Sequence, residues 1–242
     1  MTTGVRRRMG VEERKRQLIG VALELFSHRS PEDVSIDDIA AAAGISRPLV
    51  YHYFPGKQSL YEAALRRAAD ELAARFLEPH EGPLGARLHR VMERFFDFVD
   101  EHGTGFSALM RGGPAAGSGT ATVALIDGVR QAAYEQILAH LGVQEPPARL
   151  ELVVRSWVSL AESKALLWLD GRRIPRQELE WQLVHDFAAL SAVSAAYDEE
   201  MAGILLKILA DEPADGAFAD LVGRLVRLGA GAVTLPEQSR QV

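Results

Sequence analysis

The sequence predicts an all-α fold, and three observations carry that prediction. Apolar residues recur with the 3.6-residue period of amphipathic helices along most of the chain. No stretch shows the strict alternation of a half-buried strand, because β-branched clusters such as Val153-Val154 lie inside helical patterns. Glycine, proline and capping residues divide the pattern into segments of helical length.

The first two helices have clear boundary signals. An amphipathic segment over about Val11–His28 predicts the first helix, which Ser30-Pro31 terminates. Ser35 then precedes Ile36-Asp37-Asp38 in the S-x-x-D pattern of a capping box, in which two side chains satisfy backbone N–H groups. A short second helix is therefore expected over Ile36–Ala43.

A tight turn and a third short helix follow. Gly44 can adopt the positive φ that a sharp helix–helix turn requires. Ser46 is expected to cap the next helix, with Pro48 in the first turn, where a missing N–H costs nothing. Pro55 closes this helix after Phe54.

The rest of the chain continues with longer helices. Glycine-rich Arg111–Thr120 is expected to be a loop. The predicted helices cover about Gln58–Glu78, Leu84–His102, Thr104–Met110, Thr120–Leu141, Pro147–Asp170, Pro175–Tyr197, Asp198–Ala210 and Ala217–Leu228.

Composition excludes several functional classes. The chain has 242 residues, 48% of them hydrophobic and 25% charged, as in an ordinary globular protein. It has no cysteine, which excludes disulfides, thiolate catalysis and sulfur-ligated metal sites. No apolar run has the ~20 residues of a membrane helix, and the amino-terminal residues lack the apolar core of a secretory signal. We therefore expect a cytoplasmic protein without a membrane partner.

The second and third short helices have the spacing of a helix-turn-helix, whose second helix can lie in the major groove of DNA. Projected at 100° per residue, Val50 and Phe54 point toward the core. The opposite face carries Arg47, Pro48, Tyr51 and His52. Exposed tyrosine and histidine side chains suit hydrogen bonds to phosphates or base edges, and arginine can read guanine or hold a phosphate.

The charge distribution and the positions of the first helix starts both place the expected DNA contacts near the amino end. Residues 1–57 carry nine basic and seven acidic side chains, a net +2, whereas the remainder carries −8. An acidic body repels DNA, so nucleic-acid contacts are expected near the amino end. Lys57 stands where the fourth helix begins, and Ser35 and Ser46 precede the two short helices, so all three can approach a phosphate.

The chain resembles the DNA-binding domain of TetR-type transcriptional regulators. The matching segments are Ala22–Phe26, Val34–Ala40, Ala43–Ser46 and Leu49–Phe54, followed by Lys57 and Leu60. The resemblance implies that Tyr51, His52 and Lys57 contact DNA. Pro48 stands where many members have a small residue. Because proline stiffens the first turn and removes an N–H, this departure concerns the base-reading contacts and not the fold.

The resemblance also implies an architecture. It implies a helix-turn-helix domain over 11–57 and an effector-binding and dimerisation domain over 58–242, and the basic residues at the amino end add a predicted flexible arm over 1–10. Two helices per subunit, Leu150–Asp170 and Pro175–Val193, would form a four-helix bundle between subunits. The expected interface residues are Trp157, Leu160, Leu167, Leu183 and Phe187.

The segment Leu84–Leu141 is rich in large apolar side chains. Such residues line ligand pockets in helical bundles, but they also form ordinary core, and the pattern alone leaves both readings open. The candidates for contact with a largely apolar effector are Phe95, Phe98, Phe106, Met110 and Tyr134.

The sequence lacks the complete motifs that are typical of enzyme active sites. Gly112 and Gly117 have the spacing of a phosphate-binding loop, but Ser118 occupies the lysine position and no strand precedes them. The seven histidines show no H-x-x-x-H or E-x-x-H pairing on one helix face. We therefore expect no catalytic residues, no metal site and no cofactor.

The helix-turn-helix pattern predicts a DNA-binding protein, and the resemblance implies a ligand-responsive, homodimeric regulator that binds a palindromic operator in double-stranded DNA. Repression is the usual action of the family it resembles. The alternative is a small-molecule-binding helical protein that acts through protein partners rather than DNA.

Overall fold

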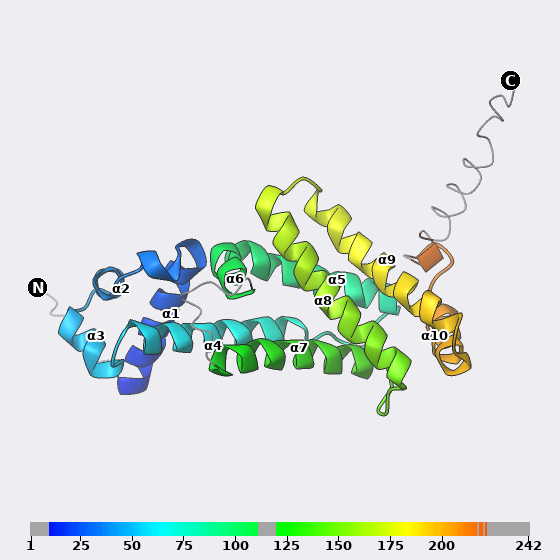
Figure 1. Cartoon of the computed structure of the whole chain (residues 1–242), viewed down its shortest axis with the longest axis horizontal. Coiled ribbons are helices and arrows are strands. Elements are labelled where there is room, and N and C mark those ends of the chain that lie inside the picture. Colours follow the sequence, from blue (N-terminus) through cyan, green and yellow to red (C-terminus); the bar gives the residue numbers. More distant parts are fainter. Residues whose placement is uncertain (1–9, 111–119, 217, 220, 222–242) are drawn as a thin grey trace, which may run out of the picture. The chain divides into compact units, whose positions relative to one another are not determined.

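The computed structural model describes residues 10–110, 120–216, 218, 219 and 221, and all regular elements in these ranges are helices (Figure 1). The predicted all-α fold is confirmed. Apart from their edges, the predicted arm at 1–10, the loop Arg111–Thr120 and the last predicted helix, Ala217–Leu228, lie outside the described residues.

The chain packs as two units. The first comprises residues up to Phe76 together with 95–133, and the second comprises 77–94 and the residues from Tyr134 onward. Helices α5 (Leu84–Glu101) and α7 (Thr120–Leu141) contribute residues to both units. The functional boundary at residue 57 stays a prediction.

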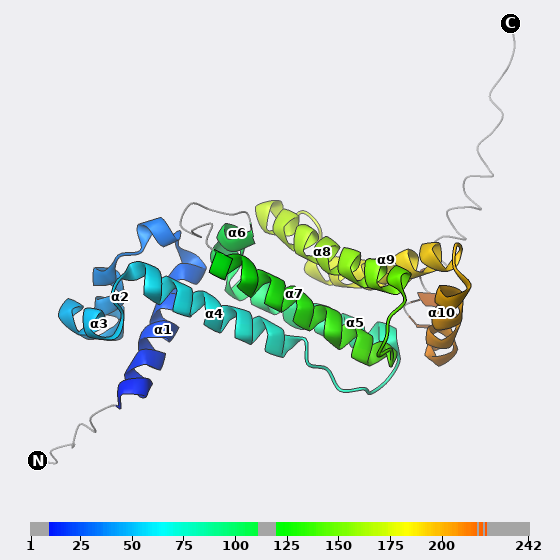
Figure 2. The ribbon, with the colours of Figure 1, turned by 60° about the horizontal axis from the view of Figure 1, so that its bottom comes forward.

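The first unit is built around its amino-terminal helix. Helix α1 (Val11–His28) packs against α2 (Ile36–Ala43), α4 (Lys57–Arg75) and α6 (Gly103–Met110), and a 3₁₀ turn η1 (Pro31–Asp33) joins α1 to α2. Helix α3 (Arg47–Tyr53) packs against α2 and lies at one end of the unit (Figures 1 and 2). The fully buried core side chains include Leu18, Ile39, Val50 and Leu60.

Local chemistry fixes the turn between α2 and α3. The capping box forms as predicted, because the Ser35 hydroxyl accepts from the Asp38 N–H at 3.1 Å and the Ser35 N–H donates to the Asp38 carboxylate at 2.8 Å. Gly44 has φ +66°, and the next N–H, that of Ile45, returns to the Ala40 carbonyl at 3.0 Å. Ser46 occupies the N-cap position of α3 as predicted, but its side chain makes no capping hydrogen bond.

The fourth helix ends at Arg75, three residues before the predicted end at Glu78. The Glu78 carboxylate instead lies in the second unit, where it accepts hydrogen bonds from Arg90 at 2.6 Å and from Arg94 at 2.7 Å. The helical periodicity of the sequence continues through Glu78 and gives no sign that its carboxylate pairs with two arginines. The two arginines compensate the cost of burying the carboxylate.

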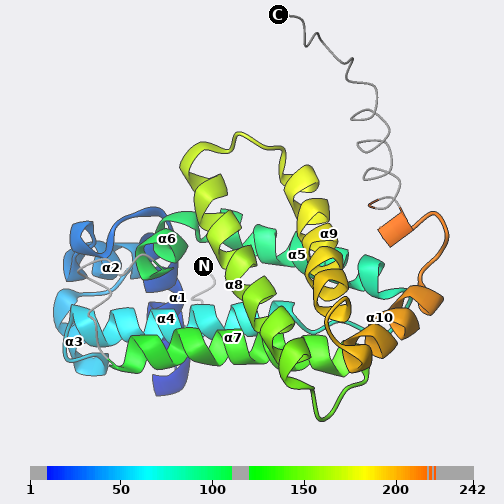
Figure 3. The same ribbon diagram turned by 45° about the vertical axis from the view of Figure 1, so that its right-hand side comes forward.

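The second unit contains three carboxyl-terminal helices, α8 (Ala148–Gly171), α9 (Arg176–Ala195) and α10 (Glu199–Asp211). A short turn through Arg172 (φ +45°) makes α8 and α9 antiparallel neighbours (Figures 1 and 3). Trp157 and Phe187 form the centre of this pair, with ring centroids 5.6 Å apart, and the Trp157 Nε1 donates to the Leu183 carbonyl at 2.7 Å. Helix α10 packs against α9.

Within the described ranges, no helix combines the length and the apolar character needed to cross a membrane.

Candidate nucleic-acid interface

The outward face of α3 carries the residues predicted to contact DNA. Arg47, Pro48, Tyr51 and His52 are all exposed, and Tyr51 keeps 42% of its surface accessible. On the opposite side Val50 is completely buried. A rigid core thus fixes the orientation of a short helix whose polar and aromatic face is open to a large ligand.

Arg47 is held in place by two neighbours. Its guanidinium donates to the Asp37 carboxylate of α2 at 2.9 Å and to the Tyr51 hydroxyl at 3.4 Å. The hydrogen bond to Tyr51, and then the Asp37 charge, raise the pKa of the Arg47 guanidinium. Because both ion-pair partners are exposed, solvent screens the pair and an incoming phosphate or base can replace Asp37.

Ser35 is exposed at the start of α2, but its hydroxyl is already engaged. It donates to the Asp38 carboxylate at 2.7 Å while accepting from the Asp38 N–H, and this side-chain hydrogen bond lowers the pKa of Asp38. A phosphate at this helix start would therefore meet the backbone N–H groups before the serine hydroxyl.

Lys57 opens α4 and connects it to the turn after α1. Its ammonium group donates to the Pro31 carbonyl at 2.9 Å, which leaves the half-buried side chain with two further N–H donors. His52 is exposed beside Tyr53, with ring centroids 5.0 Å apart. The structure thus brings Arg47, Tyr51 and His52 to one surface.

Sequence reasoning missed Asp37 and Pro31, the protein partners of Arg47 and Lys57. Asp37 is ten residues from Arg47, and Pro31 is 26 residues from Lys57. No short-range pattern pairs residues at such separations. The carboxylate in the first turn of α2 was visible only as part of a capping signal.

Two family models match the chain. The model described as "Bacterial regulatory proteins, tetR family" covers residues 18–64, and that described as "Tetracyclin repressor-like, C-terminal domain" covers residues 84–190. A crystal structure of a TetR-family transcriptional regulator from Streptomyces coelicolor is 77% identical in sequence. It superposes with a TM-score of 0.89 over 92% of this chain and 100% of the other.

The chain belongs to the TetR family. It is a DNA-binding transcriptional regulator and not an enzyme. The transcriptional activator FasR of Mycolicibacterium smegmatis is 29% identical over 174 residues, which are 69% of this chain and 77% of FasR. The transcriptional repressor LfrR of the same species is 37% identical over 90 residues, 36% of this chain and 47% of LfrR.

The predicted effector-contacting residues of this regulator are mostly buried. In the first unit Phe95 and Phe106 meet edge to face with centroids 6.2 Å apart, whereas Phe98 lies under the Arg75 guanidinium at 5.4 Å. Met110 is partly buried there as well. Tyr134 lies in the second unit, with the Arg155 guanidinium 4.2 Å from its ring centroid. These contacts are compatible with ordinary core and with a pocket wall.

The predicted interface residues of the regulator divide into two groups. Trp157, Leu183 and Phe187 are buried within the single chain, so they leave no surface for a second subunit to cover. Leu160 is half-buried, and Leu167 is 72% exposed. A subunit contact on α8 and α9 therefore has to use their outward faces.

Proposed function

We propose that this regulator is a cytoplasmic homodimer that represses transcription by binding an operator, and that a small molecule releases it. The exposed face of α3, with Arg47, Tyr51 and His52 above the buried Val50, is the single observation that carries the proposal. In a twofold dimer two such helices enter successive major grooves about 34–36 Å apart, so the operator should be approximately palindromic.

The outward faces of α8 and α9 support the dimer. Ser156, Ser159 and Ser163 are exposed on α8, and small side chains allow the backbones of packed helices to approach closely. Leu152 and Leu167 on α8 and Val193 on α9 are large, apolar and exposed in the single chain. Covering them with the same faces of a second copy would form a four-helix bundle.

The aromatic side chains near Phe95 and Phe106 support a largely apolar effector. The effector would act by population shift, because a ligand that prefers a dimer with the wrong spacing of recognition helices lowers DNA affinity. Repression is the simplest action, since occupying the operator needs no additional contact with polymerase.

A gel-shift titration with the DNA upstream of the regulator's own gene tests the proposal. Tyr51→Ala should weaken binding to all duplexes about equally, and the affinity should fall steeply as salt rises. Arg130→Ala is a suitable control, because Arg130 also forms a surface ion pair, with Asp127 at 3.3 Å, but lies on α7. Unchanged binding by Tyr51→Ala would show that the recognition face is misassigned.

A further inference from the structure

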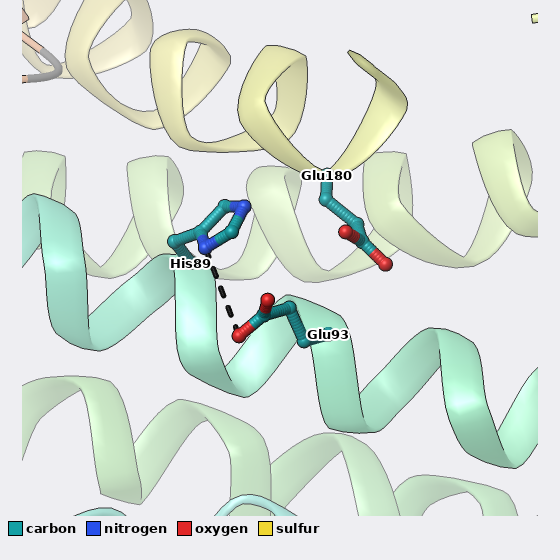
Figure 4. Close-up of side chains that lie close together, drawn as sticks. All are labelled: His89, Glu93 and Glu180. Carbon is teal, nitrogen blue, oxygen red and sulfur yellow. Dashed lines mark ion pairs between the residues drawn. The ribbon is translucent and has the colours of Figure 1, made fainter. Parts of the chain in front are cut away.

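Three side chains with metal-binding atoms meet in the second unit. His89 and Glu93 lie one turn apart on α5, and Glu180 projects from α9 toward them (Figure 4). One ligand atom from each residue lies within 4.8 Å of the other two. DNA binding and the proposed subunit contact make no use of this cluster.

The His89 imidazole is oriented but lacks hydrogen bonds. Its ring stacks on the Trp181 indole, with centroids 3.8 Å apart and planes inclined by 18°. The Nε2 atom is buried without a partner among the described residues, and Nδ1 lies 3.8 Å from the Glu93 carboxylate, beyond hydrogen-bond distance. Either tautomer therefore leaves the ring unsatisfied.

The position of the Nδ1 atom suits a metal ligand, because it faces the Glu93 carboxylate at 3.8 Å. A neutral imidazole carries a lone pair on one of its two ring nitrogens. When the proton is on Nε2, the lone pair of Nδ1 faces a carboxylate oxygen, and two acceptors so arranged repel each other unless a cation lies between them.

Glu180 adds a second carboxylate. Only 4% of its surface is exposed, and Arg176 holds it with an Nε–Oε1 distance of 2.6 Å. The same guanidinium donates to the backbone carbonyl of Glu93 at 2.6 Å. A carboxylate has about four lone-pair sites, so Glu180 can bind Arg176 and an ion together. The Glu93 and Glu180 carboxylates and the Arg176 guanidinium together carry one negative charge, and the nearby Arg90 is itself paired with Glu78 at 2.6 Å.

We propose that His89, Glu93 and Glu180 form a binding site for a divalent transition-metal ion of the Zn²⁺ class. One imidazole and two carboxylates from two helices match the ligands that Zn²⁺ takes, whereas Mg²⁺ and Ca²⁺ favour oxygen alone.

The cluster can close around such an ion with a side-chain adjustment. Three ligand atoms at about 2.0–2.2 Å from one tetrahedral Zn²⁺ lie roughly 3.3–3.6 Å apart. His89 Nδ1 and the Glu93 carboxylate are already 3.8 Å apart, so the largest separation, within 4.8 Å, has to shorten by about 1 Å, which the half-exposed Glu93 side chain can supply. That exposure also admits water to complete the coordination shell. The bound ion links α5 to α9 within the second unit.

Calorimetric titration of the untagged, chelator-treated full chain with ZnCl₂ tests the site. We expect one Zn²⁺ per chain, no binding of Mg²⁺, and visible d–d absorption when Co²⁺ is bound instead. Zn²⁺ at about 100 times its Kd should raise the unfolding temperature by roughly 5–10 °C.

Variants locate the ion. Glu93→Gln changes a half-exposed side chain and should weaken Zn²⁺ binding at least about tenfold, as even the loss of a supporting residue costs roughly 10–100-fold. His89→Gln should do the same. Glu178→Gln, an exposed acid on α9, and His80→Gln, beside the separate His140, should bind as the parent does. Absence of binding, or parental affinity in Glu93→Gln and His89→Gln, overturns the proposal.

Discussion

The Arg47 side chain is oriented by its protein partners but can still exchange them for a group on DNA. Its partners Asp37 and Tyr51 hold the guanidinium across the exposed face of α3. Exposed ion pairs contribute little to folding, so exchanging Asp37 for a guanine or phosphate costs little. The pair should serve mainly to aim the guanidinium toward DNA.

Arg47→Ala should therefore relax sequence preference while leaving the fold intact. We expect its affinity for the operator to fall by roughly 5- to 150-fold and its affinity for a scrambled duplex to change much less. Fluorescence anisotropy titrations with both duplexes at one salt concentration would measure the ratio. An equal loss on both duplexes would mean that Arg47 contacts only phosphates.

His140 makes a second residue-level prediction. It is buried in the second unit, where the Arg87 guanidinium donates to its Nδ1 at 3.0 Å and the His80 ring lies 4.4 Å away. Because arginine only donates, Nδ1 must accept and the imidazole is neutral. Burial, followed by the Arg87 charge, lowers the pKa of His140 to about 4.

Acid should therefore destabilise the fold through this side chain. The unfolded chain takes up the proton near pH 6.5 and the folded chain only near pH 4, so stability falls as the pH drops through that window. His140→Gln keeps an acceptor for Arg87 and should remove on the order of 2 kcal/mol of this pH dependence. Urea unfolding of both proteins at several pH values would measure it, and parallel curves would contradict the prediction.

At the scale of helices, the sequence predicted those helix ends and turns that depend on residues close together in the chain. The capping box at Ser35 and the positive φ at Gly44 were readable because each involves neighbours within a few residues. Helix α2 and the boundaries of α1 match their predictions for the same reason. The exposed face of α3 followed from periodicity alone.

What the sequence did not predict depends on residues distant along the chain. Helix α4 ends before Glu78, whose carboxylate is hydrogen-bonded to Arg90 and Arg94, 12 and 16 residues further along the chain. The metal-binding spacings H-x-x-x-H and E-x-x-H do not occur in the sequence, and His89 and Glu93 have the spacing H-x-x-x-E instead. Their third neighbour, Glu180 of α9, is too distant along the chain to be paired with them from the sequence. Burial of Trp157 between α8 and α9 likewise required the three-dimensional pairing.

The contact between α6 and α1 offers a prediction about an element. A Cβ added at Gly105 of α6 would lie 2.9 Å from the backbone carbonyl oxygen of Phe26 in α1, so the helices would have to separate. We expect Gly105→Ala to destabilise the fold by about 1–3 kcal/mol, as overpacking typically does. Gly20→Ala in α1, where a Cβ meets no atom within 4 Å, should be neutral or stabilising. Thermal unfolding compares the two, and equal stability would contradict this packing.

The regulator as a whole carries a formal charge of −6, whereas residues 1–57 carry +2. A subunit with this distribution gains little from approaching DNA except through its amino-terminal helices. In the proposed dimer, two such groups would bind far more tightly than one, because the second contact becomes intramolecular. Operator affinity should therefore depend on the dimer as much as on α3.

Leu167→Glu tests this dependence by placing a charge on the outward face of α8. Leu167 is exposed in the single chain, so the substitution leaves the core of the subunit untouched, whereas burying an unpaired carboxylate between two copies is unfavourable. Sedimentation velocity should show monomers for this variant and dimers for Leu206→Glu, which changes an exposed leucine on α10. The monomer should retain weak binding to a single half-site and lose its preference for two correctly spaced half-sites. A dimeric Leu167→Glu protein with parental operator affinity would exclude this face of α8 from the subunit contact.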